Sequence, residues 1–77
     1  MNQQEILNYI KSLSNEEQGL YSKTEITKKE RGRLHEIDEE LKQYWDLLRQ
    51  RRALRRAGRN PEKAKLRKKN VVKSYEQ

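Results

Sequence analysis

The chain has 77 residues, of which 31% are hydrophobic and 40% charged, so it forms one domain at most. It has no cysteine and a single histidine, which excludes disulfides, thiolate metal sites and a zinc site. The formal net charge of +7 comes from the C-terminal part. Residues 1–48 have ten acidic residues and seven lysines or arginines, whereas residues 49–77 have two acidic residues and twelve lysines or arginines. Such a basic arm favours polyanions or acidic protein surfaces as partners, although a solvated tail has the same composition.

Size and hydropathy also limit the class of protein. A core in so short a chain contributes only about 3–5 kcal/mol, and small domains usually add a cross-link or a partner subunit. We therefore expect self-association, most simply as a dimer. No apolar run approaches the roughly 20 residues of a membrane span, and residues 1–5 do not resemble a signal peptide. We expect a cytoplasmic protein without a membrane partner.

A first helix is expected over residues 3–21. Asn2 and Glu5 have the spacing of a reciprocal cap. Apolar side chains then recur at intervals of three and four on one wide face: Ile6, Tyr9, Ile10, Leu13 and Leu20. Glu17 falls at the centre of this face, where a carboxylate needs a donor. We expect Glu17 to pair with Arg33 of the next helix and fix the register; the alternative is that Glu17 reaches solvent.

A second helix is expected over residues 28–57. Thr27 and Glu30 form another capping box, and Gly58 followed by Asn60-Pro61 is a stop signal. The apolar seam of this helix consists of Leu34, Ile37, Leu41, Tyr44 and Leu48. Because a short loop makes consecutive helices antiparallel neighbours, the expected fold is an all-α antiparallel helical hairpin over residues 1–58.

The apolar stripe of the second helix turns into arginine after Leu48. In the expected register Ile6 lies opposite Leu48. The N-terminal end of the first helix is therefore expected near Leu48 of the second helix. Arg52, Arg55 and Arg59 continue the stripe. Burying an unpaired guanidinium costs several kcal/mol. This end of the hairpin is therefore expected to be wet or to bind anions.

Residues 59–77 form a basic C-terminal arm, expected to be partly ordered or docked. Asn60 as a cap and Pro61 in the first turn are compatible with a further short helix, although residues 62–69 have one large apolar side chain and cannot drive packing alone. Val71, Val72 and Tyr75 are apolar enough to dock onto the hairpin or onto a second copy.

Catalytic motifs are absent: the sequence has no phosphate-binding glycine loop, nucleophile elbow or Cys/His pair. We therefore expect no enzyme and no cofactor. The acidic cluster of residues 36–40 resembles a di-metal bundle only loosely, since His35 has the wrong spacing. We expect these carboxylates to be solvated, with partners such as Lys42 or Arg33.

Two kinds of binding remain open. The first is weakly sequence-specific attraction of RNA or DNA phosphates by the candidate residues Arg49, Arg51, Arg52, Arg55, Arg56, Arg59, Lys65, Arg67, Lys68 and Lys69. The second is a protein-interaction or structural module anchored by Trp45, Leu47 and Leu54, with the arginine stripe pairing with carboxylates of the partner. Leu47 and Leu54 are expected on a face distinct from the seam, as a second contact surface for a homodimeric four-helix bundle.

The segment from Trp45 to Ala53, with the sequence WDLLRQRRA, resembles the hallmark of a family of short bacterial proteins of unknown function. Further similarities are Glu16-Glu17, Thr27 with Glu30, Arg33-Leu34, Gly58, Pro61, Val71-Val72, Tyr75 and Gln77. The resemblance covers essentially the whole chain and implies a small two-helix protein without an established activity. Family members tend to be more acidic after the proline and to have a proline near residues 68–69. The arginines of residues 49–52 match the family, whereas the lysines of residues 63–69 look peculiar to this chain.

Overall fold

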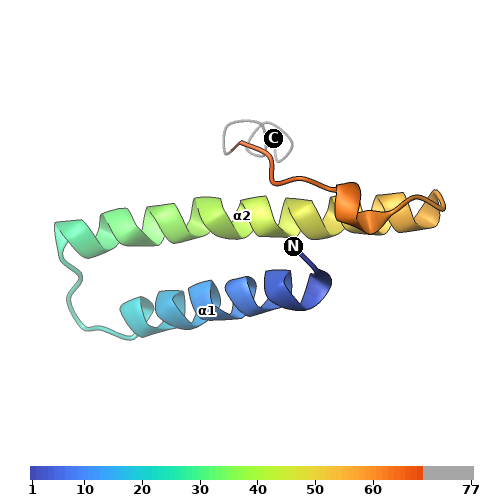
Figure 1. The fold of residues 1–77 in the computed structure, drawn as a ribbon. Coiled ribbons are helices and arrows are strands. Elements are labelled where there is room, and N and C mark those ends of the chain that lie inside the picture. The colour runs from blue at the N-terminus through green and yellow to red at the C-terminus, as the bar shows by residue number, and fades with distance from the viewer. Residues whose placement is uncertain (69–77) are drawn as a thin grey trace.

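The computed structural model describes residues 1–68, which form two long helices and one short helical turn (Figure 1). Helix α1 spans Gln3–Tyr21, helix α2 spans Lys28–Arg56, and the 3-10 helix η1 spans Pro61–Lys63. The two α-helices pack against each other, and the described part contains no strand. The all-helical class is therefore confirmed, and both α-helices have the predicted bounds to within one residue.

Both helix starts are capped as their sequences predict. The Asn2 side chain accepts a hydrogen bond from the Glu5 amide at 2.8 Å, and the Glu5 carboxylate accepts one from the Asn2 amide at 3.1 Å. Thr27 and Glu30 repeat this exchange at the start of α2, with both distances 3.1 Å. Each reciprocal pair satisfies two backbone groups near the helix start, which is why these boundaries were predictable.

The end of α2 is closed by a glycine in the left-handed conformation. Gly58 has a φ of 72°, a region that L side chains rarely adopt. Its amide donates to the Arg55 carbonyl at 3.1 Å, and the next amide, of Arg59, donates to the Leu54 carbonyl at 2.8 Å. These two bonds are the Schellman pattern. They reverse the chain direction, so that η1 lies beside the last turns of α2.

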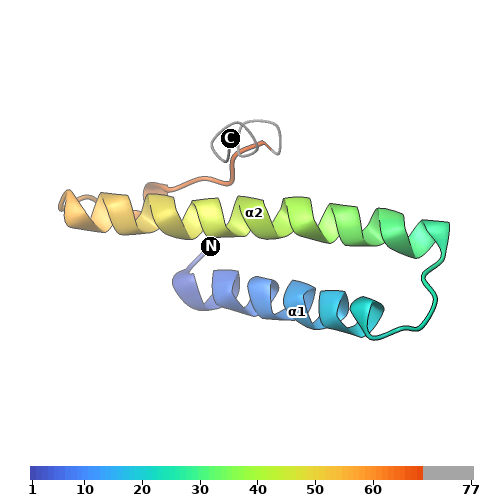
Figure 2. The same ribbon diagram turned by 180° about the vertical axis from the view of Figure 1, so that it is seen from behind.

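Helix α1 lies alongside α2 and covers only part of its length (Figure 1). Polar contacts join the start of α1 to the end of α2, where Gln3 accepts a hydrogen bond from Arg55 at 2.9 Å. They also join the later part of α1 to the first turns of α2, where Glu16 accepts two hydrogen bonds from Arg33. The last turns of α2 extend past the start of α1 (Figure 2). The start of α1 nevertheless reaches this arginine-rich end, because Gln3 contacts Arg55, so the sequence-based expectation that Arg55 lies beyond the first helix is wrong.

The core is small and lies between the helices. Ile6 and Ile37 are fully buried, and Ile6 joins Ile10 and Leu47 in one apolar cluster. Tyr44 packs against this cluster, and its ring stacks on that of Tyr9 with centroids 5.3 Å apart. Burial raises the pKa of Tyr44, and the neighbouring Tyr9 hydroxyl adds to the effect.

The predicted pairing of Glu17 with Arg33 is wrong by one residue. The Arg33 guanidinium donates two hydrogen bonds to the Glu16 carboxylate, at 2.6 and 2.9 Å. This fork lowers the pKa of Glu16 and raises that of Arg33. Glu17 lies on the predicted apolar face and is half-buried. The length of the arginine side chain lets it reach the rim of that face, where Glu16 lies, without burying its charge.

Acid is expected to destabilise the fold through Glu30. A hydrogen bond from Lys23 and one from the Thr27 backbone lower the pKa of this carboxyl from 4.5 to about 2. Because the folded pKa lies below the unfolded one, the stabilisation is complete above about pH 4.5 and is lost as the pH falls towards 2. Circular dichroism melts across this range should show the loss, and Glu30→Gln should flatten it. An unchanged profile for Glu30→Gln would contradict this assignment.

Residues 59–68 fold back along α2 (Figures 1 and 2), and Ala64 packs against the core cluster that α1 and α2 share. Asn60 caps η1 by accepting a hydrogen bond from the Glu62 amide at 3.0 Å. The short helix that Asn60 and Pro61 indicated is the single turn Pro61–Lys63, and residues 64–68 have no regular secondary structure. One large apolar side chain in this segment gives a longer helix too little to bury. Lys69, Val71, Val72 and Tyr75 lie outside the described residues.

Candidate functional site

The segment of residues 61–67, called the docked arm below, is held on α2 by side-chain hydrogen bonds. The Gln50 amide donates to the Lys65 carbonyl at 2.8 Å and accepts from the Lys65 amide at 3.4 Å. Gln43 donates to the Arg67 carbonyl at 2.9 Å. These contacts satisfy backbone groups that have no helical partner in the extended segment. The glutamines therefore position the arm's basic side chains beside α2.

Asp46 connects the same face of α2 to the arm's arginine. Its carboxylate is buried, accepts a hydrogen bond from Gln50 at 2.8 Å, and lies 3.7 Å from the Arg67 guanidinium. The roles of Gln43, Asp46 and Gln50 were not predicted from the sequence. Their common signal is a polar stripe at intervals of three and four residues, and its purpose becomes visible only when the direction of the arm is known.

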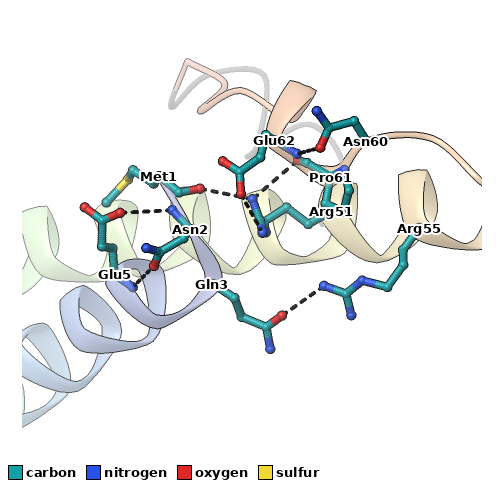
Figure 3. A network of polar contacts seen from close by, with 9 residues as sticks. All are labelled: Met1, Asn2, Gln3, Glu5, Arg51, Arg55, Asn60, Pro61 and Glu62. Atoms are coloured by element: carbon teal, nitrogen blue, oxygen red, sulfur yellow. Dashed lines mark hydrogen bonds and ion pairs between the residues drawn. The ribbon is translucent and has the colours of Figure 1, made fainter.

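Arg51 was predicted to bind phosphate, and this prediction is wrong. Its side chain is 8% exposed. The guanidinium donates to the carbonyl of Met1 at 3.0 Å and to that of Pro61 at 3.4 Å, and it pairs with Glu62 at 3.3 Å (Figure 3). Arg51 therefore joins the N-terminus, α2 and the docked arm. The oxygens around its two terminal nitrogens replace water there, whereas its buried Nε has no hydrogen-bond partner within residues 1–68.

The predicted second contact surface is also wrong at Leu47, which is 4% exposed. Leu47 packs with Ile6 and Ile10 of α1, and Ala64 of the docked arm closes over the same cluster. Leu54 is half-buried and lines a groove together with Ala64. The arm thus covers a surface that the sequence left available for a partner. Trp45 alone of the three predicted anchors is exposed, at 52%.

The exposed ridge consists of four α2 side chains: Trp45, Arg49, Arg52 and Arg56. Intervals of four, three and four residues place them on one face of the helix, and all four are exposed. Within residues 1–68, no carboxylate lies within 4.0 Å of the three guanidinium groups. Helix α1 and the docked arm cover other faces of α2, so the ridge faces solvent between them.

A groove lies on each side of the exposed ridge. The groove towards α1 has a volume of about 180 Å³, and its lining includes Leu7, Trp45 and Arg52. The groove towards the docked arm has a volume of about 310 Å³ and is lined in part by Arg49 and Arg67. Cationic side chains therefore border both grooves.

The remaining candidate cations are distributed around this end of the molecule. Arg55 is exposed and donates to Gln3 at 2.9 Å, and Arg67 is half-buried beside Asp46. The other described candidates are exposed: Arg59, Lys65 and Lys68. A polyanion lying on the ridge would meet several of these charges in addition to the three ridge arginines.

The acidic cluster of residues 36–40 forms ion pairs with neighbouring cations. Arg33 lies 3.2 Å from Glu36 and 3.8 Å from Glu40, and Lys42 lies 3.2 Å from Asp38. Residues 1–68 contain no group of three or more side chains that could hold a metal ion. No described helix is long and apolar enough to cross a bilayer.

Comparison with known proteins places the whole chain in one family. The family described as "Protein of unknown function (DUF2630)" matches residues 2–77. The chain belongs to this family. An uncharacterized protein of Mycobacterium tuberculosis (strain H37Rv) is 40% identical to this DUF2630 chain over 75 residues, covering 92% of the chain and 86% of the relative. An uncharacterized protein of Mycobacterium bovis is similar to the same extent. No solved structure matches the chain.

Proposed function

We propose that this DUF2630 protein is a non-enzymatic accessory protein that binds RNA or DNA through its exposed ridge. One observation carries the proposal: Arg49, Arg52 and Arg56 share a face of α2 that neither α1 nor the docked arm covers. Each adjacent pair lies three or four residues apart, and like charges at this spacing destabilise a helix by about 0.2–0.5 kcal/mol. A bound polyanion would relieve this repulsion.

The position of the arginines in the helix supports a binding role over a structural one. Cations in a last helical turn are favoured by the helix dipole, which accounts for Arg56. The dipole effect fades within one turn, so it does not account for Arg49 or Arg52. Structural use of arginine in this region is represented by Arg51, which is buried among oxygen acceptors. The ridge arginines make no such contacts within residues 1–68.

Salt-dependent binding tests this proposal. Affinity for RNA or DNA should fall steeply with salt concentration, because bound phosphates release counterions. Replacing Arg49, Arg52 and Arg56 by alanine should weaken binding and reduce the slope of log K against log salt by about 3, or about 1 for each phosphate contact. Fluorescence anisotropy of a labelled oligonucleotide measures both quantities.

The matched control removes three exposed positive charges from the opposite end of α2, at Lys28, Lys29 and Arg31. Its net charge equals that of the ridge variant, so any effect of overall charge appears in both. Equal losses in the two variants would refute a localised site. Absence of wild-type binding at low salt would refute nucleic-acid binding altogether. Retained affinity for a protein partner at high salt would instead favour the adaptor function.

The finer architecture is part of the same proposal: an antiparallel hairpin over residues 1–58 that is completed by self-association. The contacts of Gln3 with Arg55 and of Glu16 with Arg33 support opposite helix directions. The small core favours self-association, because so few buried side chains provide only limited stability to a single subunit. Exposed Tyr9 and Leu7 are available on α1 for such a contact.

A further inference from the structure

We propose that the exposed ridge binds single-stranded nucleic acid, with Trp45 as the platform on which one base stacks. This inference rests on the proposed nucleic-acid function and adds the strand type that the site accepts. Arginines alone attract any polyanion, whether duplex or single strand. An exposed indole in the same row of side chains provides a surface on which a base stacks, a contact that phosphate groups do not make.

The indole of Trp45 has the exposure and the surroundings that stacking requires. The residue is 52% exposed, although its helix is flanked by α1 and by the docked arm. Leu7 from α1 and Leu48 from α2 line the adjoining groove beside it. Its volume of about 180 Å³ exceeds that of an apolar cavity of about 150 Å³ that holds benzene. One planar ring therefore fits against the indole with apolar side chains at its edge.

Cations surround this apolar position on the sides where phosphates would lie. Arg52 and Arg55 line the same groove, and Arg49 follows Trp45 by one helical turn. Arg55 donates to the Gln3 side-chain amide, which is neutral and so does not offset the arginine's charge. A base stacked on Trp45 would bring its flanking phosphates towards these guanidinium groups. The combination of an aromatic platform with a cationic track is the usual chemistry of single-strand binding.

Duplex nucleic acid fits the same surface less well. In a duplex the base faces are stacked on their neighbours, so an indole reaches them only after unpairing or wedging, which costs a few kcal/mol. A single strand exposes its bases at little cost. Trp45 should therefore add affinity for a single strand and almost none for a duplex of equal length.

Trp45 is the only tryptophan in the chain, so its fluorescence reports directly on the proposed contact. The full-length protein is titrated with an unstructured single-stranded RNA of about 12 nucleotides, within the range of known single-strand sites, and with a duplex of the same length. We expect emission to be quenched by the single strand and to change little with the duplex. Trp45→Leu should weaken single-strand binding about 10-fold and leave duplex binding unchanged, whereas Trp45→Phe should retain most of the affinity.

The possible outcomes distinguish a failure of base stacking on Trp45 from a failure of the proposed nucleic-acid binding. Equal affinities for both strand types, with unchanged emission and a neutral Trp45→Leu, would overturn the stacking role and leave polyanion binding intact. No binding of either RNA would overturn both proposals. A concentration-dependent shift in the Trp45 emission of the free wild-type protein, together with a dimer in sedimentation that Trp45→Leu abolishes, would assign the groove to a second copy and overturn the inference. Circular dichroism establishes that each variant is folded.

Discussion

Replacing Arg51 by alanine should destabilise the protein by about 2–3 kcal/mol, since it removes hydrogen bonds that join a charged group to otherwise poorly solvated carbonyls. The guanidinium, which α2 carries, connects Met1 at the N-terminus with Pro61 and Glu62 of η1 and so joins three segments of the chain (Figure 3). Its loss leaves two carbonyl oxygens without this donor and an empty volume beneath the docked arm. Urea unfolding followed by circular dichroism measures the change.

The neighbouring arginine provides the matched control. Arg52 is exposed and has no carboxylate partner within residues 1–68, so Arg52→Ala should change stability by no more than about 0.5 kcal/mol. The effect on nucleic-acid affinity should have the reverse order: Arg52→Ala should reduce the affinity more than Arg51→Ala does. Arg51→Lys should recover little of the lost stability, because one ammonium cannot reproduce the planar fork of the guanidinium. Similar stabilities for the two alanine variants would contradict the buried role of Arg51.

Replacing Leu47 by alanine should cost about 2–4 kcal/mol, the range for removing a large buried aliphatic side chain. Leu47 contributes to the small core between α1, α2 and the docked arm, where Ile6, Ile10 and Ala64 surround it. So small a core cannot redistribute the loss over many other contacts. Thermal and urea unfolding at fixed protein concentration measure the effect.

Trp45→Ala is the control for this second comparison, because the indole is half exposed and lies outside the central cluster. Its effect on stability should remain clearly smaller than that of Leu47→Ala. If Leu47 instead anchored a partner, Leu47→Ala would lower the dimerisation constant without changing the stability of the monomer. Repeating both measurements over a range of protein concentrations distinguishes core packing from association.

Local signals account for the parts of the fold that sequence analysis predicted. The capping pairs Asn2–Glu5 and Thr27–Glu30 and the left-handed turn at Gly58 act within a few residues of their own positions. A cap depends only on side-chain chemistry and spacing, so it can be identified without knowing what the helix packs against. The change of the apolar stripe into arginine after Leu48 did not mark the end of the contact with α1, because Gln3 still contacts Arg55 about two turns further on.

The errors concern residues whose role depends on segments distant in the sequence. Periodicity placed Leu47 on a free surface and Arg51 among the phosphate-binding cations, because nothing local predicts that the arm folds back over α2. The same limitation shifted the partner of Arg33 from Glu16 to Glu17, since helical periodicity sets which face is apolar and leaves the reach of a long side chain open.

The amino-acid sequence by itself determined the helices, their ends, and the accumulation of positive charge at one end of the chain. Only the tertiary structure decided which of the arginines is free to bind and which is structural. Arg51 and Arg52 are identical in chemistry and adjacent in sequence, yet helical geometry turns them about 100° apart. One consequently faces the N-terminus and the docked arm, where carbonyl oxygens surround it, and the other faces water.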